Sequence, residues 1–90
     1  MEAIRGEIMF TEKDIINPDE RIVKVCETVK KRKVVFFAIH DKHLDYWRTE
    51  NPFDDYAAWS RDICLRAKFD TRRLAEAEMS RIHQWRREQT

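Results

Sequence analysis

The longest unbroken hydrophobic stretch of the chain is residues 34–39, with the sequence VVFFAI, and any core must include it. A run this short is compatible with a buried strand or with a segment of buried helix. Its β-branched and aromatic residues suit a strand. The flanks favour a helix, because no glycine or proline lies between Pro18 and Pro52 to turn the chain into and out of a strand.

A helical period extends on both sides of this stretch. At about 100° per residue, nine side chains fall on one face. The pattern predicts a helix over residues 18–48. Because globular helices usually span about 8–20 residues, we expect a bend near the basic residues 30–33. The side chains of this face are Ile22, Val25, Cys26, Val29, Phe36, Phe37, His40, Leu44 and Trp47.

Three helix-start signals divide the rest of the chain. Asn17-Pro18 and Asn51-Pro52 each place a capping residue before a proline, and acidic residues follow within the first turn. The second signal predicts a central packed helix over residues 52–69. Asp70-Thr71 begins an amphipathic helix over residues 71–88, and Glu78 within its stripe could reach water or meet an arginine. The apolar stripe of this last helix is Leu74, Ala75, Met79, Ile82 and Trp85.

The N-terminal residues 1–16 carry weaker signals. Residues 3–10 alternate between apolar and polar side chains, which suits a short strand or an arm across the core. Thr11 and Asp14 have the spacing of a capping box, so a short helical turn is expected before Asn17.

Together these patterns predict one mostly α domain over residues 1–90, a small helical bundle of three or four helices. One glycine in 90 residues suits helices better than a strand-rich fold, whose tight turns usually need glycine or asparagine. A minor β element from residues 3–10 and 33–40 remains an alternative for those two segments.

Composition narrows the class of protein. Charged residues make up 39% of the chain and hydrophobic residues 42%, which indicates a globular domain and not a disordered chain. No apolar run approaches the roughly 20 residues of a membrane span, and no signal peptide is recognisable. We therefore expect a cytoplasmic protein in which Cys26 and Cys64, both in apolar settings, are buried and reduced.

Charge alternates along the chain in blocks that the net charge of +1 conceals. Two basic against six acidic residues give residues 1–20 a charge of −4, and six against one give residues 21–33 a charge of +5. Three against six give residues 41–62 a charge of −3, and seven against four give residues 63–90 a charge of +3. Such blocks could neutralise one another within the fold or present separate faces to a partner.

No catalytic, metal or cofactor motif stands out. His40 and His43 have a spacing that metal sites use, and Asp41 and Asp45 lie close in sequence. A third ligand would have to come from His83 or Cys26 through tertiary packing. Neither cysteine has the local signature of a nucleophile, so a small metal or thiol enzyme is only a second alternative.

Nucleic-acid binding is the first alternative function. The basic segments 30–33 and 72–87 could neutralise phosphates, and exposed aromatic rings could stack on bases. Seventeen acidic residues nearly match eighteen basic ones, however, and no short glycine-bearing turn indicates a helix-turn-helix.

The function expected from the sequence is that of a small non-catalytic protein-binding module. It would act as an adaptor, an assembly subunit or an inhibitor of a larger machine, without a cofactor, and an origin in a phage or mobile element is compatible with its size. The partner would be another protein, bound through charged faces and exposed aromatic residues of the kinds that dominate interfaces. The expected contact residues are Lys30, Lys31, Arg32, Lys33, Arg72, Arg73, Arg87, Tyr46, Trp47 and Trp59.

Overall fold

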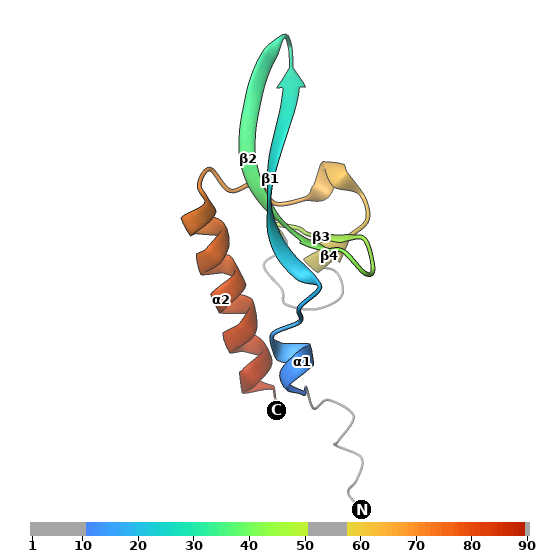
Figure 1. Cartoon of the computed structure of the whole chain (residues 1–90), viewed down its shortest axis with the longest axis vertical. Coiled ribbons are helices and arrows are strands. Elements are labelled where there is room, and N and C mark those ends of the chain that lie inside the picture. Colours follow the sequence, from blue (N-terminus) through green and yellow to red (C-terminus); the bar gives the residue numbers. More distant parts are fainter. Residues whose placement is uncertain (1–10, 51–57, 90) are drawn as a thin grey trace, which may run out of the picture.

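The computed structural model describes residues 11–50 and 58–89 and shows an antiparallel sheet with a C-terminal helix (Figure 1). The four strands follow one another in the sheet in the order β1-β2-β3-β4. Short helical elements precede and follow the sheet. The elements in chain order are α1 (Glu12–Ile15), β1 (Glu20–Val29), β2 (Arg32–Asp41), β3 (Tyr46–Arg48), β4 (Trp59–Ser60), a 3-10 turn (Ile63–Leu65) and α2 (Arg72–Glu88).

The prediction of a mostly α helical bundle is wrong. Residues 18–48 contain β1, β2 and β3, and the described part of residues 52–69 contains β4 and the 3-10 turn. Residues 33–40 do lie in a strand, β2, whose neighbours are β1 and β3. Residues 71–88 contain α2, as expected. The predictions for residues 3–10 and 51–57 lie outside the described residues.

The hairpin between β1 and β2 turns without glycine. Its two loop residues, Lys30 and Lys31, have φ angles of 51° and 67°, in the left-handed region. Two-residue hairpin loops need such angles and usually contain Asn-Gly. The register then runs without a bulge from the pair Val29–Arg32 to the pair Glu20–Asp41. Two lysines therefore occupy a turn for which the sequence gives no ordinary signal.

The hydrophobic run of β2 is continuous because the middle of the strand is covered on both faces. Successive side chains of a strand point to opposite faces. The Arg72 guanidinium of α2 lies 5.7 Å from the ring centroid of Phe37, whereas Arg66 and Lys68 lie 5.1 Å and 5.2 Å from that of Phe36. Helix α2 thus covers one face, and the segment after the 3-10 turn covers the other.

The core lies around this part of the sheet. The buried apolar side chains come from β2, from α2, from α1 and from the segments beside β4 and after the 3-10 turn. They are Ile15, Phe36, Ala38, Ile39, Ala58, Ala67, Ala75 and Ile82.

Arginine 86 fastens the end of α2 to the start of the sheet. Its guanidinium donates to the carboxylate of Glu20 at 2.7 Å and 2.6 Å. It also donates to the backbone carbonyls of Asp14 and Ile15, both at 3.1 Å. These bonds join α1, β1 and α2 at one end of the molecule. None of the helices in the described ranges combines the length and apolar composition of a membrane span.

The opposite end of the molecule is the distal half of the β1–β2 hairpin, residues 26–35, which we call the arm. Figure 1 shows the arm extending beyond α2 and beyond β3 and β4. Every one of its residues except Glu27 is exposed. The arm is therefore a projecting part of the described chain whose side chains are available to a partner.

Candidate functional site

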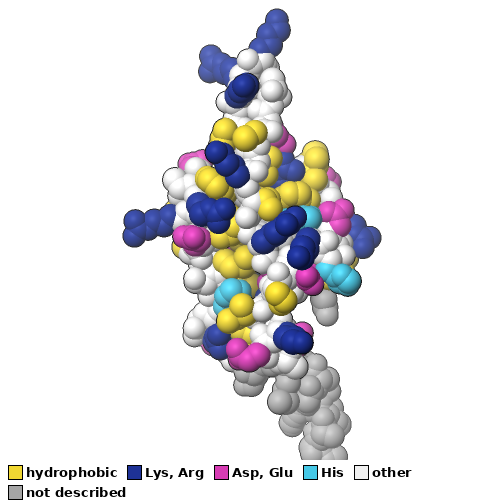
Figure 2. Space-filling model, in the orientation of Figure 1, with side chains coloured by type: hydrophobic (Ala, Val, Ile, Leu, Met, Phe, Trp, Pro, Cys, Tyr) yellow, Lys and Arg dark blue, Asp and Glu magenta, His cyan; other side chains and the backbone are white. Residues whose placement is uncertain are grey.

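Positive charge gathers at the tip of the arm. Lys30 and Lys31 form the turn, Arg32 and Lys33 begin β2, and all four side chains are exposed. Figure 2 shows these basic groups at the upper end of the molecule. Glu27, the one acidic residue that the sequence places between residues 21 and 40, forms an ion pair with Arg66. The positive charge of the tip is therefore not neutralised by an acid of the arm.

Three valines of the arm are also exposed. Val29, Val34 and Val35 retain 47%, 39% and 49% of their accessible surface. Directly paired residues of an antiparallel ladder share a face, so Val29 and Val34 lie on one face and Val35 lies with Cys26 on the other. Arg32 lies on the first face and Lys33 on the second. Each face therefore combines exposed valine with a basic side chain, a surface that suits an apolar groove bordered by carboxylates.

The base of the arm is fixed by Arg66, which is 6% exposed. Its guanidinium lies 5.1 Å from the ring centroid of Phe36 and 5.0 Å from that of Trp47, and it pairs with Glu27. Among the described residues, its Nε atom has no hydrogen-bond partner. A cation held over an aromatic ring contributes about 2 kcal/mol when the contact is desolvated. Arg66 therefore joins β1, β2 and β3 where the arm begins.

The aromatic residues expected to bind the partner are half-buried and contact side chains of the chain itself. Arg61 lies 5.0 Å from the ring centroid of Tyr46. The ring of Trp47 packs on that of His40 at 4.3 Å. Arg48 lies 5.8 Å from the ring centroid of Trp59. These three aromatic residues stabilise the sheet and are not part of the candidate surface on the arm.

The basic residues of α2 lie apart from the tip. Arg72 covers Phe37 at the base of the arm, so about 20 Å of strand separates it from the turn. Arg73 is exposed beside it. Arg87 lies about 22 Å farther along α2 and pairs with Glu12 at 3.7 Å. The structure therefore does not bring the two predicted basic segments together into one patch.

Among the described residues, no third metal ligand joins His40 and His43. His40 pairs with Asp45 at 2.8 Å, and the carboxylate of Asp41 accepts the backbone N–H groups of His43 and Leu44. These bonds organise the turn between β2 and β3. Within residues 11–50 and 58–89, no group of three or more His, Cys, Asp or Glu side chains could hold a metal ion.

His83 lies on α2, away from that turn. Burial lowers the pKa of His83, and the nearby charge of Arg86 and Arg87 lowers it further, whereas Glu20 raises it. The imidazole is thus held toward its neutral form by its surroundings in the helix.

Both cysteines are exposed, so the prediction of buried thiols is wrong. Cys26 lies on the arm, and Cys64 lies in the 3-10 turn. The apolar residues next to each cysteine in the sequence did not indicate burial of its thiol. Alternate residues of a strand, and residues of a short turn, can face solvent although their sequence neighbours are apolar.

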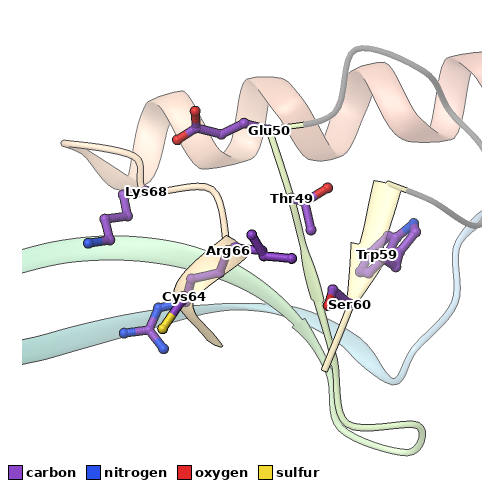
Figure 3. A pocket seen from close by; sticks show the side chains of 8 residues that line it. Thr49, Glu50, Trp59, Ser60, Cys64, Arg66 and Lys68 are labelled. Atoms are coloured by element: carbon purple, nitrogen blue, oxygen red, sulfur yellow. The ribbon is translucent and has the colours of Figure 1, made fainter. Parts of the chain in front are cut away.

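An open hollow of about 690 Å³ lies between β3, β4 and the segment after the 3-10 turn (Figure 3). Its polar lining includes Glu50, Ser60, Cys64 and Lys68. In Figure 3 the Arg66 side chain leads away toward β1 and β2. No histidine is among the described residues that line the hollow, so Cys64 has no imidazole base beside it there.

Two charged side chains of the interior meet between β3 and α2. Arg48, which is 1% exposed, donates from Nε to the carboxylate of Glu78 at 3.1 Å. Arg81 donates to the same carboxylate at 2.9 Å. Burial raises the pKa of Glu78, but the hydrogen bonds and charges of Arg81 and Arg48 outweigh it and lower the pKa overall. Glu78 thus meets an arginine, which was one of its two expected environments.

No family model matches the chain, and neither a curated protein nor a solved structure matches it. Its function therefore has to be inferred from its own surface.

Proposed function

We propose that this protein is a small non-catalytic protein-binding module of the cytoplasm, an adaptor, assembly subunit or inhibitor of a larger machine. The arm contacts the partner. The observation that supports this function is the exposure of Val29, Val34 and Val35, at 47%, 39% and 49%, beside four exposed basic residues on a projecting ribbon.

The two kinds of side chain contribute differently to binding. Full burial of a valine side chain is worth roughly 1.5–3 kcal/mol, so covering the exposed half of three valines could supply about 2–4 kcal/mol. Lys30, Lys31, Arg32 and Lys33 add attraction to an acidic surface, which mainly accelerates association. The partner is therefore a protein whose apolar groove is bordered by carboxylates.

Nucleic-acid binding is the second candidate, and the charge of the arm favours it. The tip carries four consecutive basic residues, and its nearest acid, Glu27, is paired with Arg66. A two-stranded ribbon also fits the major groove of B-DNA, which is about 12 Å wide. The valines oppose this function, because phosphate contacts leave them in water.

Capture of the partner from a lysate of the native host tests the proposal. The lysate is treated with nuclease and passed over three immobilised proteins. These are the wild type, the double variant Val34→Ser with Val35→Ser, and the matched control Leu74→Ser. Leu74 is 52% exposed on α2, so its substitution changes an equally apolar surface away from the arm. The control should retain the protein partner and the arm variant should lose it. Retention by both variants would contradict a role of the arm.

A charge-reversal variant separates the two candidates. Lys31→Glu with Arg32→Glu should slow association with the protein partner and leave the melting temperature within a few degrees, because exposed charges stabilise folds little. A titration of duplex DNA against salt gives the complementary result. If the four exposed basic residues at the tip contact phosphates, log K should fall with log salt at a slope of about −3 to −4. Such a slope would favour the nucleic-acid function.

A further inference from the structure

The outer edge of β1 presents backbone groups without a strand beside it. The N–H group of Phe37 donates to the Phe69 carbonyl at 2.8 Å, and the N–H group of Phe69 donates back at 2.9 Å. Phe37 therefore turns its backbone away from β1. Its ladder partner is Lys24, which must in turn direct its own N–H and C=O groups away from β2. Because alternate residues of a strand direct their backbone groups to the same side, the N–H and C=O groups of Cys26 and Thr28 also point away from β2.

Nothing in the described parts of the chain pairs with this edge. β1 is the terminal strand of the sheet, and no hydrogen bond from residues 11–50 or 58–89 reaches the outward backbone groups of Lys24, Cys26 or Thr28. The ladder has no bulge, and β1 contains no proline. Of the devices that usually protect an edge strand, charge is the one that β1 shows, on the exposed side chains of Arg21 and Lys24.

We propose that an acidic, extended segment of the partner protein adds to the sheet as an antiparallel strand along β1. This inference rests on the proposed protein-binding function and names the way in which the partner binds. Backbone hydrogen bonds supply the affinity of such strand addition, and side chains supply its specificity.

The charge of β1 selects the occupant of the edge. A second copy of this chain, paired antiparallel in the register centred on Lys24, would place two lysines directly opposite each other. Like charges in that position destabilise a ladder, whereas opposite charges stabilise it. In this register, the lysine that opposes self-association favours an acidic strand.

The two faces of β1 also define the pattern of the incoming strand. Lys24, Cys26 and Thr28 lie on one face, and Val25 and Val29 lie on the other. Glu27 also lies on the second face, where its charge is paired with that of Arg66. A complementary strand places acidic side chains beside the first face and apolar side chains beside the second. The partner segment therefore alternates acidic and apolar residues.

A synthetic peptide of about ten residues with alternating glutamate and valine is the probe. In the bound peptide, the residues directly opposite Lys24, Cys26 and Thr28 lie on the same face as these three residues. Because they form hydrogen-bonded antiparallel pairs, their N–H groups point toward β1. The glutamates occupy these places. Methylation of the glutamate nitrogens should thus remove the bonding donors, whereas methylation of the valine nitrogens leaves the ladder intact. By fluorescence anisotropy, the first isomer should bind at least about tenfold more weakly than the second.

A pair of variants at Cys26 tests the same edge from the protein side. Cys26→Pro removes the outward N–H group, and proline is tolerated on an edge strand where that group faces solvent. Cys26→Val keeps the N–H group with a side chain suited to a strand. The proline variant should bind the unmodified peptide about tenfold more weakly, and the valine variant within about twofold of wild type. If the proline variant fails to fold, the two methylated peptides still decide the question.

Equal binding of the two methylated isomers, or no binding of the unmodified peptide, would overturn strand addition. A lysine–valine peptide that binds as well as the glutamate–valine peptide would overturn the acidic preference. Dimers of the protein alone that Cys26→Pro dissociates would assign the edge to a second copy. None of these results changes the capture experiment with Val34 and Val35, so the proposed function and its binding mode can fail separately.

Discussion

Replacing Lys30 and Lys31 by asparagine and glycine should stabilise the fold and weaken partner binding at the same time. Both lysines adopt left-handed backbone angles, with φ of 51° and 67°. Asparagine and glycine are the residues that this type of hairpin turn ordinarily contains. The substitution therefore removes backbone strain and two positive charges together.

The expected magnitude follows from the backbone. A left-handed conformation costs a residue with a Cβ atom about 1–2 kcal/mol. Asparagine reduces this cost, and glycine removes it but loses about 0.5–1 kcal/mol of conformational entropy on folding. The double substitution should then raise the free energy of unfolding by about 1–2 kcal/mol. For a domain of this size, that gain corresponds to a rise in Tm of at least about 4 °C.

Equilibrium urea unfolding and thermal melting measure the gain, and amide hydrogen exchange at Val29 and Arg32 reports on the arm itself. The matched control replaces Lys30 and Lys31 by alanine. Alanine removes the same charges but keeps a Cβ atom in both left-handed positions, so it isolates relief of charge repulsion from relief of strain. Both variants should bind the partner more weakly than the wild type.

An Asn-Gly variant no more stable than the Ala-Ala variant, with unchanged exchange at Val29 and Arg32, would refute the strain argument. Equal gains in both variants would assign the effect to charge repulsion at the tip. Undiminished binding by both variants would remove Lys30 and Lys31 from the proposed contact surface.

Three further outcomes are expected. Glu78→Gln leaves the buried guanidinium of Arg48 without a full counter-charge and should lower the free energy of unfolding by about 2 kcal/mol at about pH 7. Burial raises the pKa of Glu78, but its arginines lower it overall. The carboxylate therefore stabilises the fold at pH values above 4.5, the ordinary pKa of glutamate, and this stabilisation is lost in acid. Urea unfolding at about pH 3 should therefore show a smaller difference in stability between Glu78→Gln and the wild type. Burial and neighbouring arginines lower the pKa of His83, so the wild type should lose stability as the pH falls below its ordinary value of 6.5, and His83→Gln should lose less over the same range. Cys26 and Cys64 should both react with a thiol reagent about as fast in the native protein as in the denatured protein. Slow labelling of either thiol in the native protein would contradict its exposed position.

The helix at the C-terminus could be predicted because local signals and tertiary packing agree there. The Thr71 side chain caps α2 by accepting the N–H group of Leu74, and Ala75 and Ile82 of the predicted stripe are buried. The capping box of Thr11 and Asp14 also forms. In both places the residues that start the helix are followed by residues that favour it.

The sheet could not be predicted because its turns use unusual or ambiguous residues. Asn17 bonds to the N–H group of Asp19 at 2.9 Å, so Asn-Pro forms a turn that leads into a strand where a helix start was expected. The β1–β2 hairpin turns through two lysines, and the turn before β3 places Asp45 at a φ of 57°. The spacing that suggested one helical face therefore came from residues of three strands, β1, β2 and β3, and of the turn before β3.

The sequence indicated the candidate site only through its positive charge, and not through its shape or its exposed valines. The block of +5 over residues 21–33 is evident by counting, but its concentration at the end of a ribbon depends on the hairpin. The buried roles of Arg48 and Arg66 were missed, because arginine is usually exposed unless it is paired. The neighbours Cys64, Leu65 and Ala67 were the available hint that Arg66 lies in a partly apolar setting.

Three departures from the ordinary rules of folding occur together on the arm. Its turn holds two lysines in left-handed angles, its valines are about half-exposed, and its outer strand edge has no partner among the described residues. Each of these features costs stability. Of the contacts that secure the fold, those of Arg66 reach the arm only at Glu27, near its base, and those of Arg86 lie at the other end of the molecule. Local inconsistencies of this kind are expected where a surface is shaped for function. A partner that covers the valines, neutralises the lysines and pairs with the edge would resolve all three at once, which is why binding through the arm accounts for them better than three unrelated defects.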